Sequence, residues 1–411
     1  MRRILGQNLL ITLISKGLSF VAAFYIIKIL SKEDYALYNQ VLILLTFLPY
    51  FEIAVTRGFF IEYPKSIHTR APDESTNLFT HYTVFIILMY LILGSFIFIG
   101  NIPGSYVFCT VIFLQFLLSK FIEVLNTYYN SHLRMQQMLN IKYITDIITP
   151  VLTIVLLYLY PSAWCVFLSQ TLIYGSIIAY IFVKNHVHIF PLHIVWKGFY
   201  NDIRFLVMAG FLIHITGWLD ITLLNCDKIF ITRFYDPVTI ANYCFAWNTA
   251  NFIFIIGASI VGPYSQYLFR ELSLSEWEKT RTLIRKVNRQ LLGLLAVCLA
   301  GALIFFPLLV QLKAYEKYEG TYPFFALLVF GNAAFAFMGI YKYYINAMKL
   351  NRWLLILEVG LLGAGSISFF LLKHYNQPLI FFSAFYVLLQ LTFLSFIIVK
   401  VTRHIRKAIN V

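Results

Sequence analysis

The chain has 411 residues, of which 60% are hydrophobic and only 12% are charged, and its formal net charge is +14. A soluble domain carries roughly 25% charged residues and cannot hide so much apolar surface. This composition excludes an ordinary soluble enzyme and predicts a helical integral membrane protein, because helices satisfy every backbone polar group inside a bilayer. The positive charge lies in short segments between apolar runs, which is typical of membrane topology and argues against nucleic-acid binding.

Apolar runs long enough to cross a bilayer follow one another along the chain. Such a run needs about 20 mostly apolar residues. Twelve runs are found, near 7–29, 37–58, 79–100, 105–127, 142–161, 163–183, 205–226, 238–261, 290–311, 322–345, 351–372 and 378–400. The first run resembles a signal peptide, but Lys16 interrupts it and no cleavage site of small residues follows. We therefore expect an all-α polytopic protein with twelve transmembrane helices, the first one retained.

The distribution of lysine and arginine predicts the orientation of these helices. With the N-terminus inside, the inside segments hold most of the 32 basic residues, Lys342 and Lys400 among them. The outside segments hold only Lys28, Lys32, Lys228, Arg233, Lys313, Lys317 and Lys373. Because basic residues accumulate on the cytoplasmic side, this bias predicts that both termini are cytoplasmic. The longer connections, near 59–78, 184–204 and 264–289, then lie in the cytoplasm.

Two segments about half the chain apart resemble each other. The sequence ILSKEDYALY ends at Tyr38, and FYDPVTIANY ends at Tyr243. A second pair of matching segments holds Tyr128 and Tyr343. Parallel repeats of this kind are typical of transporters. We therefore expect two six-helix bundles around a central cavity, an N-terminal bundle over 1–200 and a C-terminal bundle over 201–411.

The motifs of several enzyme classes are absent from the sequence. There is no G-x-x-x-x-G-K-(S/T), no G-x-S-x-G and no H-E-x-x-H. His186 and His188 have no carboxylate or cysteine nearby, and the five cysteines are scattered among apolar runs. We therefore expect no enzymatic activity, no metal and no cofactor. The glycines of the eleventh run, Gly360, Gly363 and Gly365, are interpreted as helix-packing positions.

Polar residues recur on one face of three predicted spans. They lie at three- and four-residue steps, which place them on one side of a helix. The sets are Asn8, Thr12, Ser15, Lys16 and Ser19 in the first span, Gln115, Ser119, Glu123, Asn126 and Asn130 in the fourth, and Asn248, Asn251, Ser259 and Gly262, beside Trp247, in the eighth. Hydrogen bonds between helices explain each set separately, whereas the three together favour a hydrated cavity. Lys16, Asn8, Lys120, Glu123, Asn248, Asn251 and Trp247 are therefore candidate cavity-lining residues.

Charged residues within apolar spans are costly and usually functional. Lys120 and Glu123 are three residues apart and can pair on one helix. Arg57, at the cytoplasmic mouth of the second span, is either a site for a lipid phosphate or a topology anchor. The candidates for binding a coupling ion are Asp220, Glu52, Glu358 and His214. Asp220 is favoured because it lies next to the repeat position of Lys16, with which it could also form a permanent pair.

Two short motifs resemble a known family. The segment from Leu30 to Tyr38 resembles the L-S-x-E-x-(F/Y)-G-x-Y segment that follows the first helix of bacterial polysaccharide-unit flippases. The segment from Asp227 to Ile231 resembles the D-K-x-x-I of their second half. The chain thus resembles the O-antigen repeat-unit flippases (Wzx-type) of the multidrug/oligosaccharidyl-lipid/polysaccharide exporter superfamily.

The resemblance implies a cargo, a direction and a location. The cargo would be an undecaprenyl-pyrophosphate-linked oligosaccharide, moved from the cytoplasmic to the periplasmic leaflet of a bacterial inner membrane by two bundles that alternate in access. Membrane lipids and the polysaccharide polymerase machinery would be its partners. Cationic residues in the cavity would lower the cost of moving the anionic pyrophosphate through a low-dielectric interior.

Two other functions fit parts of the same sequence. An ion-coupled multidrug or metabolite exporter of the same superfamily would share the fold and the topology. A membrane-embedded glycan polymerase or ligase would have a similar number of spans, but such enzymes carry a large periplasmic loop, and all outside connections here are short. The nature of the cargo separates the first alternative from a flippase.

Overall fold

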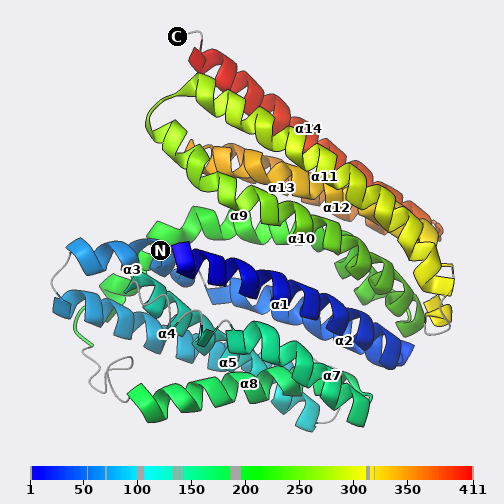
Figure 1. Ribbon diagram of the computed structural model, residues 1–411, viewed down its shortest axis with the longest axis horizontal. Helices are drawn as coiled ribbons and strands as arrows, with labels where there is room; N and C mark the ends of the chain where they lie inside the picture. Colours follow the sequence, from blue (N-terminus) through cyan, green and yellow to red (C-terminus); the bar gives the residue numbers. More distant parts are fainter. Residues whose placement is uncertain are drawn as a thin grey trace. The chain divides into compact units, whose positions relative to one another are not determined.

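The computed structural model describes residues 2–52, 54–69, 72–99, 106–132, 137, 140–141, 143–185, 196–311, 315–318 and 320–409. Within these ranges every regular element is a helix (Figure 1). The first part of the chain contains α1 (Arg2–Ile29), α2 (Lys32–Phe47), η1 (Leu48–Glu52), α3 (Val55–Thr69), α4 (Pro72–Ile99), α5 (Tyr106–Ser131), η2 (Ile144–Ile148), α7 (Thr149–Leu159) and α8 (Ala163–Asn185). The rest contains α9 (Phe199–Phe234), α10 (Pro237–Ser273), α11 (Trp277–Gln311), η3 (Glu316–Tyr318), α12 (Tyr322–Ala347), α13 (Asn351–His374) and α14 (Leu379–Ile409).

Eight of the described helices are long and apolar enough to cross a membrane. They are α4, α5, α8, α9, α11, α12, α13 and α14. The all-helical, multi-pass character expected from the sequence is thus confirmed. Four apolar runs remain. They lie on α1, on α2 with η1 and the beginning of α3, on η2 with α7, and on α10. The count of twelve spans stays a prediction.

The chain divides into two compact units, Met1–His214 and Ile215–Val411, and the division falls inside α9. In the first unit, α5 packs against α4 on one side and α8 on the other, around buried rings such as Phe116 and Phe167. In the second unit, α12 packs between α10 and α14, and α11 lies beside α14 (Figure 1). Most residues of α12 are buried, which makes this helix the centre of its unit.

The two similar sequence segments begin helices in the same way. Ser31 precedes α2, and its Oγ accepts a hydrogen bond from the backbone N–H of Asp34 at 3.1 Å. Asp236 precedes α10, and its Oδ1 accepts from the N–H groups of Val238 and Thr239, each at 3.0 Å. These bonds satisfy N–H groups that have no partner inside the helix. Hydrogen bonds to Thr239, chiefly from its side chain, also hold the pKa of the Asp236 carboxyl below its usual range.

The second apolar run is broken, which differs from the single helix expected over 37–58. Helix α2 ends at Phe47, the tighter turn η1 follows, and α3 begins at Val55. Pro49 has no N–H group to continue an α-helix, and Leu48 before it is the last residue whose N–H makes an α-helical bond, to the Leu44 carbonyl. Ala54 then adopts a left-handed conformation with φ of 67°. The apolar pattern did not reveal this break, because apolar residues continue on both sides of it.

The beginning of α3 crosses the first half of α9 with backbone against backbone. A Cβ atom on Gly58 would lie 1.9 Å from the carbonyl oxygen of Leu206, and one on Gly210 would lie 2.4 Å from that of Ala54. Only glycine permits so close an approach at these two positions. This crossing holds the broken helix against α9.

Candidate functional site

A buried ionic cluster lies beside the break in the first unit. The Lys120 ammonium is 2.7 Å from the Glu123 carboxylate on the same helix, so the pair expected from the sequence is present. It also lies 3.1 Å from the carboxylate of Glu52, the last residue of η1. The side chains of Lys120 and Glu52 are 4% and 5% exposed, whereas that of Glu123 is 43% exposed. The cluster therefore connects the break to α5, and Glu123 is its exposed member.

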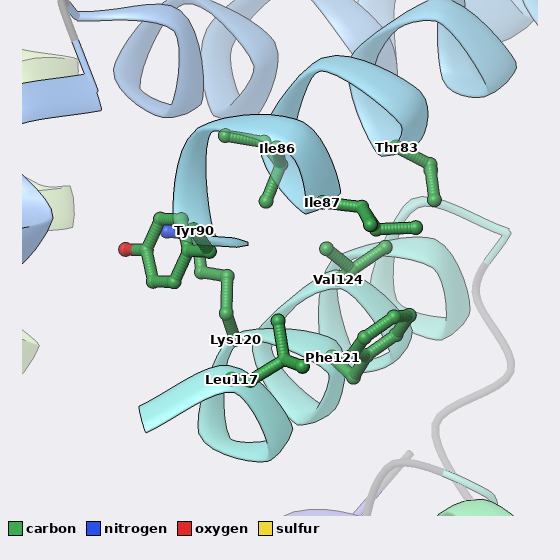
Figure 2. Close-up of a pocket in the computed structure, with 8 residues that line it drawn as sticks. All are labelled: Thr83, Ile86, Ile87, Tyr90, Leu117, Lys120, Phe121 and Val124. Carbon is green, nitrogen blue, oxygen red and sulfur yellow. The ribbon is translucent and has the colours of Figure 1, made fainter. Parts of the chain in front are cut away.

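Tyr90 of α4 contacts this cluster. The Tyr90 hydroxyl donates to Glu52 at 3.3 Å, and the Lys120 ammonium lies 5.2 Å from the centre of the Tyr90 ring. Figure 2 shows Lys120 reaching from α5 toward Tyr90 on α4, at one end of a small pocket that is otherwise lined mainly by apolar side chains. A cation over an aromatic face is stabilised by the ring's quadrupole, most strongly when water is excluded.

His214 contacts the break from the other side. Its Nε2 lies 2.7 Å from the backbone carbonyl oxygen of Tyr50, in η1. That carbonyl belongs to a stretch where the regular α-helical bonds are interrupted, so the imidazole N–H satisfies an acceptor that the break exposes. Both Glu52 and His214, predicted as ion-binding candidates, are thus brought to one structural feature.

The second unit contains a cluster of similar composition. Asp220 on α9 forms an ion pair with Lys342 on α12. Glu358 on α13 is fully buried, and neither of its carboxyl oxygens has a hydrogen-bond partner within the described part of the chain. Its carboxyl group lies close enough to Asp220 and Lys342 for their charges to act on it. The Lys342 ammonium also lies 4.2 Å from the Phe335 ring centre and 4.7 Å from that of Phe393. The two predicted carboxylates Asp220 and Glu358 therefore lie together, around a lysine that had been assigned to a cytoplasmic segment.

Each cluster has two carboxyl groups and one lysine. In the first cluster the excess negative charge lies on the exposed Glu123. In the second cluster the excess carboxylate is buried, which is costly in a low-dielectric interior, and a bound proton or other cation would neutralise it.

The polar residues predicted on the eighth span lie on α10, close to the end of α9. Trp247 is buried, and Asn248 accepts a hydrogen bond from Lys228 at 3.0 Å. The sequence predicts that the seventh span ends at residue 226 and that Lys228 follows it in a connection. The structure differs, because α9 continues to Phe234 and Lys228 is 4% exposed within it.

The remaining predicted residues are scattered or lie beyond what is described. The side chains of Asn8 and Lys16 lie outside the described residues, as do His186 and His188. Arg57 is partly buried in α3. In the fourth predicted span, the Gln115 amide donates to the Gln170 carbonyl on α8 at 2.9 Å, which is a bond between helices and not a cavity contact.

Three residues of these clusters were missed at the sequence level: Tyr90, Lys228 and Lys342. Tyr90 is one of 28 tyrosines, so its type alone carries no signal. The lysines lie near the ends of apolar runs, where lysine is usually a solvated topology anchor. The one available signal was the charge of Asp220, because a carboxylate inside the membrane needs a cationic partner such as Lys342.

Comparison with known proteins identifies the family to which the chain belongs. The family described as polysaccharide biosynthesis protein matches residues 26–318, which is well over half of the chain. No curated protein matches the chain.

Solved structures share the fold at low sequence identity. The lipid II flippase MurJ in its inward closed conformation has a TM-score of 0.71 at 11% identity, covering 96% of this chain and 87% of that one. A MOP superfamily transporter from Pyrococcus furiosus has a TM-score of 0.63 at 13% identity, covering 98% and 96%. The Vibrio cholerae MATE transporter VcmN in its bent form has a TM-score of 0.58 at 14% identity, covering 97% and 98%. The chain therefore has the fold of the MOP superfamily transporters.

Proposed function

The chain belongs to the polysaccharide biosynthesis protein family, and we propose on this basis that it is a flippase for lipid-linked polysaccharide units. The observation that carries the proposal is the family match over residues 26–318. The fold agrees with it, since one similar structure is a flippase for lipid II and the likeness extends over nearly the whole chain.

The cargo we propose is an undecaprenyl-pyrophosphate-linked O-antigen repeat unit, moved from the cytoplasmic to the periplasmic leaflet of a bacterial inner membrane. Twelve spans in two six-helix bundles, 1–200 and 201–411, with both termini cytoplasmic, would alternate in access around a central cavity. Lys16, Arg57 and the polar residues of the predicted stripes would line that cavity. A polymerase that consumes the flipped unit would keep the reaction running in one direction.

Energy would come from an ion gradient that acts on the Asp220–Lys342–Glu358 cluster. A ligand shifts the balance between two conformations only by its different affinity for them. A proton bound by one of the two carboxyl groups weakens the hold of Lys342 on that group. If the cluster is closed in one conformation and hydrated in the other, the proton gradient biases the transition.

The variant Asp220→Asn tests this coupling. It imitates the protonated carboxyl, so we expect flipping in proteoliposomes to lose its response to an imposed pH gradient while cargo binding persists. Asp236→Asn is the matched control, because Asp236 is exposed and asparagine also serves as a helix cap. A parental response to the gradient in Asp220→Asn would exclude Asp220 as the coupling group.

An ion-coupled multidrug or metabolite exporter is the second candidate, favoured by the similarity to the MATE transporter. The two differ in cargo. Deleting the gene should abolish display of the surface polysaccharide if the chain is a flippase. It should leave the polysaccharide intact and raise sensitivity to toxic cations if the chain is an exporter.

A further inference from the structure

Two helices of the second unit are longer than a membrane requires. Helix α11 has 35 residues and α14 has 31, which correspond to about 52 Å and about 46 Å at a rise of about 1.5 Å per residue. The hydrocarbon core of a bilayer is about 30 Å thick, and each head-group layer adds about 5–8 Å. The apolar part of α11 begins after Arg289, and that of α14 ends before Lys400. The surplus residues, 277–289 and 400–409, therefore extend past the membrane surface, on the side that the predicted topology places in the cytoplasm.

These two extensions are packed against the unit. Helix α11 lies beside α14, and the ring of Trp277 at the start of α11 is 6.5 Å from the ring of His404 near the end of α14 (Figure 1). His404 also contacts α12, since its Nδ1 lies 2.7 Å from the Tyr344 hydroxyl oxygen. Apolar side chains of both extensions, such as Ile284 and Ile405, are buried. The second unit thus presents a folded helical surface beyond the membrane.

The α11 extension carries three exposed arginines at four-residue steps, which we call the arginine ladder. Arg281, Arg285 and Arg289 lie on one face of the helix, with successive Cβ atoms about 5–6 Å apart. Among the residues that the structure describes, none of the three forms an ion pair; the nearby Glu276 carboxylate lies 2.7 Å from the Lys279 ammonium. Like charges one helical turn apart repel each other. An anionic partner would therefore stabilise this face.

Membrane topology alone does not account for the arginine ladder. The preference for basic residues in the cytoplasm counts lysine and arginine alike. Arg281 lies about 12 Å further along the helix axis than Arg289, which is beyond the layer that holds lipid phosphates. Arginine differs from lysine in its planar fork of donors, which binds one carboxylate through two parallel hydrogen bonds. A row of arginines one turn apart thus matches a row of carboxylates with the same spacing.

We propose that the arginine ladder docks an acidic helix of a cytoplasmic protein, in which glutamate recurs at every fourth position. Two helices share one axial rise per residue, so each guanidinium of the ladder meets one carboxylate of the partner. The end of α14 adds the exposed Arg403, Arg406 and Lys407, whose field would speed the encounter with an acidic protein. The inference concerns a protein partner and not the cargo, so it does not depend on the proposed function.

Fluorescence anisotropy with the full-length protein in phosphatidylcholine nanodiscs tests this docking. One labelled probe is an alanine-based helical peptide with glutamate at every fourth position. The control peptide has the same length and composition, but its glutamates occupy every second position and so point to opposite sides of the helix. We expect the first peptide to bind at least about tenfold more tightly, because only its carboxylates align with the ladder.

Replacing the ladder by glutamine (Arg281→Gln, Arg285→Gln and Arg289→Gln together) should weaken binding of the first peptide at least about tenfold. Three lysines at the same positions should weaken it less, because they keep the charge and lose the paired hydrogen bonds. If the triple glutamine variant does not fold, as judged by its melting temperature, Arg285→Gln at the centre of the ladder replaces it.

The matched control removes the same charge from exposed positions elsewhere that are also predicted to be cytoplasmic. It combines Lys184→Gln, Lys197→Gln and Arg352→Gln. Since these positions belong to different helices and form no ladder, the Kd of the first peptide should stay within about twofold of the parental value.

Several outcomes would overturn the inference. Equal affinity for the two peptides, or binding that is unchanged when the ladder is neutralised, would show that no acidic helix is recognised. Tighter ladder-dependent binding of a single-stranded RNA oligonucleotide would assign the surface to nucleic acid. Ladder-dependent loss of peptide binding in nanodiscs that contain phosphatidylglycerol would assign it to the membrane surface.

Discussion

At the scale of residues, each buried lysine of the two clusters is stabilised by carboxylates and aromatic rings. Lys120 is held by two carboxylates and the Tyr90 ring, and Lys342 by Asp220 and two phenylalanine rings. Each lysine is thus paired with at least one carboxylate and lies over an aromatic face. Breaking such a pair costs more than the pair contributes, because the remaining charge stays buried.

Lys120→Met should therefore destabilise the protein by about 3–5 kcal/mol, since it leaves the Glu52 carboxylate buried without a cation. Thermal unfolding of the purified protein in detergent measures the loss. Adding Glu52→Gln should restore a large part of it. The control is Lys279→Met, whose exposed pair with Glu276 should be worth less than about 1 kcal/mol. Equal melting temperatures of Lys120→Met and the control would show that the Lys120–Glu52 ion pair does not stabilise the protein.

At the scale of elements, the broken second helix is the feature that gathers the first cluster. The break places Glu52 toward Lys120 and exposes the Tyr50 carbonyl to His214. Broken helices inside a membrane protein are tolerated only where neighbouring groups satisfy the freed backbone, and they are common at transporter binding sites. The close crossing of α3 and α9 at Gly58 and Gly210 fixes the beginning of α3, directly after the break, against α9.

Gly58→Ala should disrupt this crossing, because its Cβ would lie 1.9 Å from the Leu206 carbonyl oxygen. Overpacking of this kind costs about 1–3 kcal/mol, and more where backbone must move. Gly363→Ala is the matched control. Contrary to the helix-packing role predicted for Gly363, a Cβ there meets nothing within 4 Å, and alanine favours the helix. The yield of monodisperse protein and its melting temperature compare the two. A Gly58→Ala protein as stable as the control would mean that α3 and α9 separate at no cost.

At the scale of the whole molecule, each unit has its own core and its own cluster of two carboxyl groups and one lysine. The lysines lie on α5 and α12, the helices that also carry the matching tyrosines Tyr128 and Tyr343. The two lysines are 222 residues apart and the two tyrosines 215, so the clusters do not occupy matching positions of the predicted repeat.

The predicted topology is tested on the whole protein by labelling single cysteines with a membrane-impermeant maleimide, after the five native cysteines are replaced. Cysteines at Lys32, Lys317 and Asn376 should react from the periplasm of intact cells, because the predicted topology places them in outside connections. Cysteines at Gly198 and Ser275, both exposed, should react only after the cells are permeabilised. A protected cysteine at any of the first three positions would contradict the twelve-span assignment.

Composition and residue spacing in the sequence predicted the lipid environment of this protein, its helical secondary structure and its candidate charged residues. Apolar length alone identifies a membrane helix, because lipid leaves the backbone no other way to pair its polar groups. Cap residues such as Ser31 and Asp236 act within one turn, so the repeat could be recognised from local pattern. Titratable residues stand out in an apolar run without any knowledge of their partners. This identified the candidates Asp220, Glu52, Glu358 and His214 from the sequence.

Only the tertiary structure decided which partner each charge takes and where a helix breaks. The Asp220–Lys342 pair joins residues 122 positions apart, and no helical spacing relates them. Lys228 and Lys342 looked like topology anchors, because burial depends on what the neighbouring helices present and not on the residue's own run. The break at Ala54 was hidden for a related reason: its stability comes from His214, Lys120 and the glycine crossing, all of which lie on other helices.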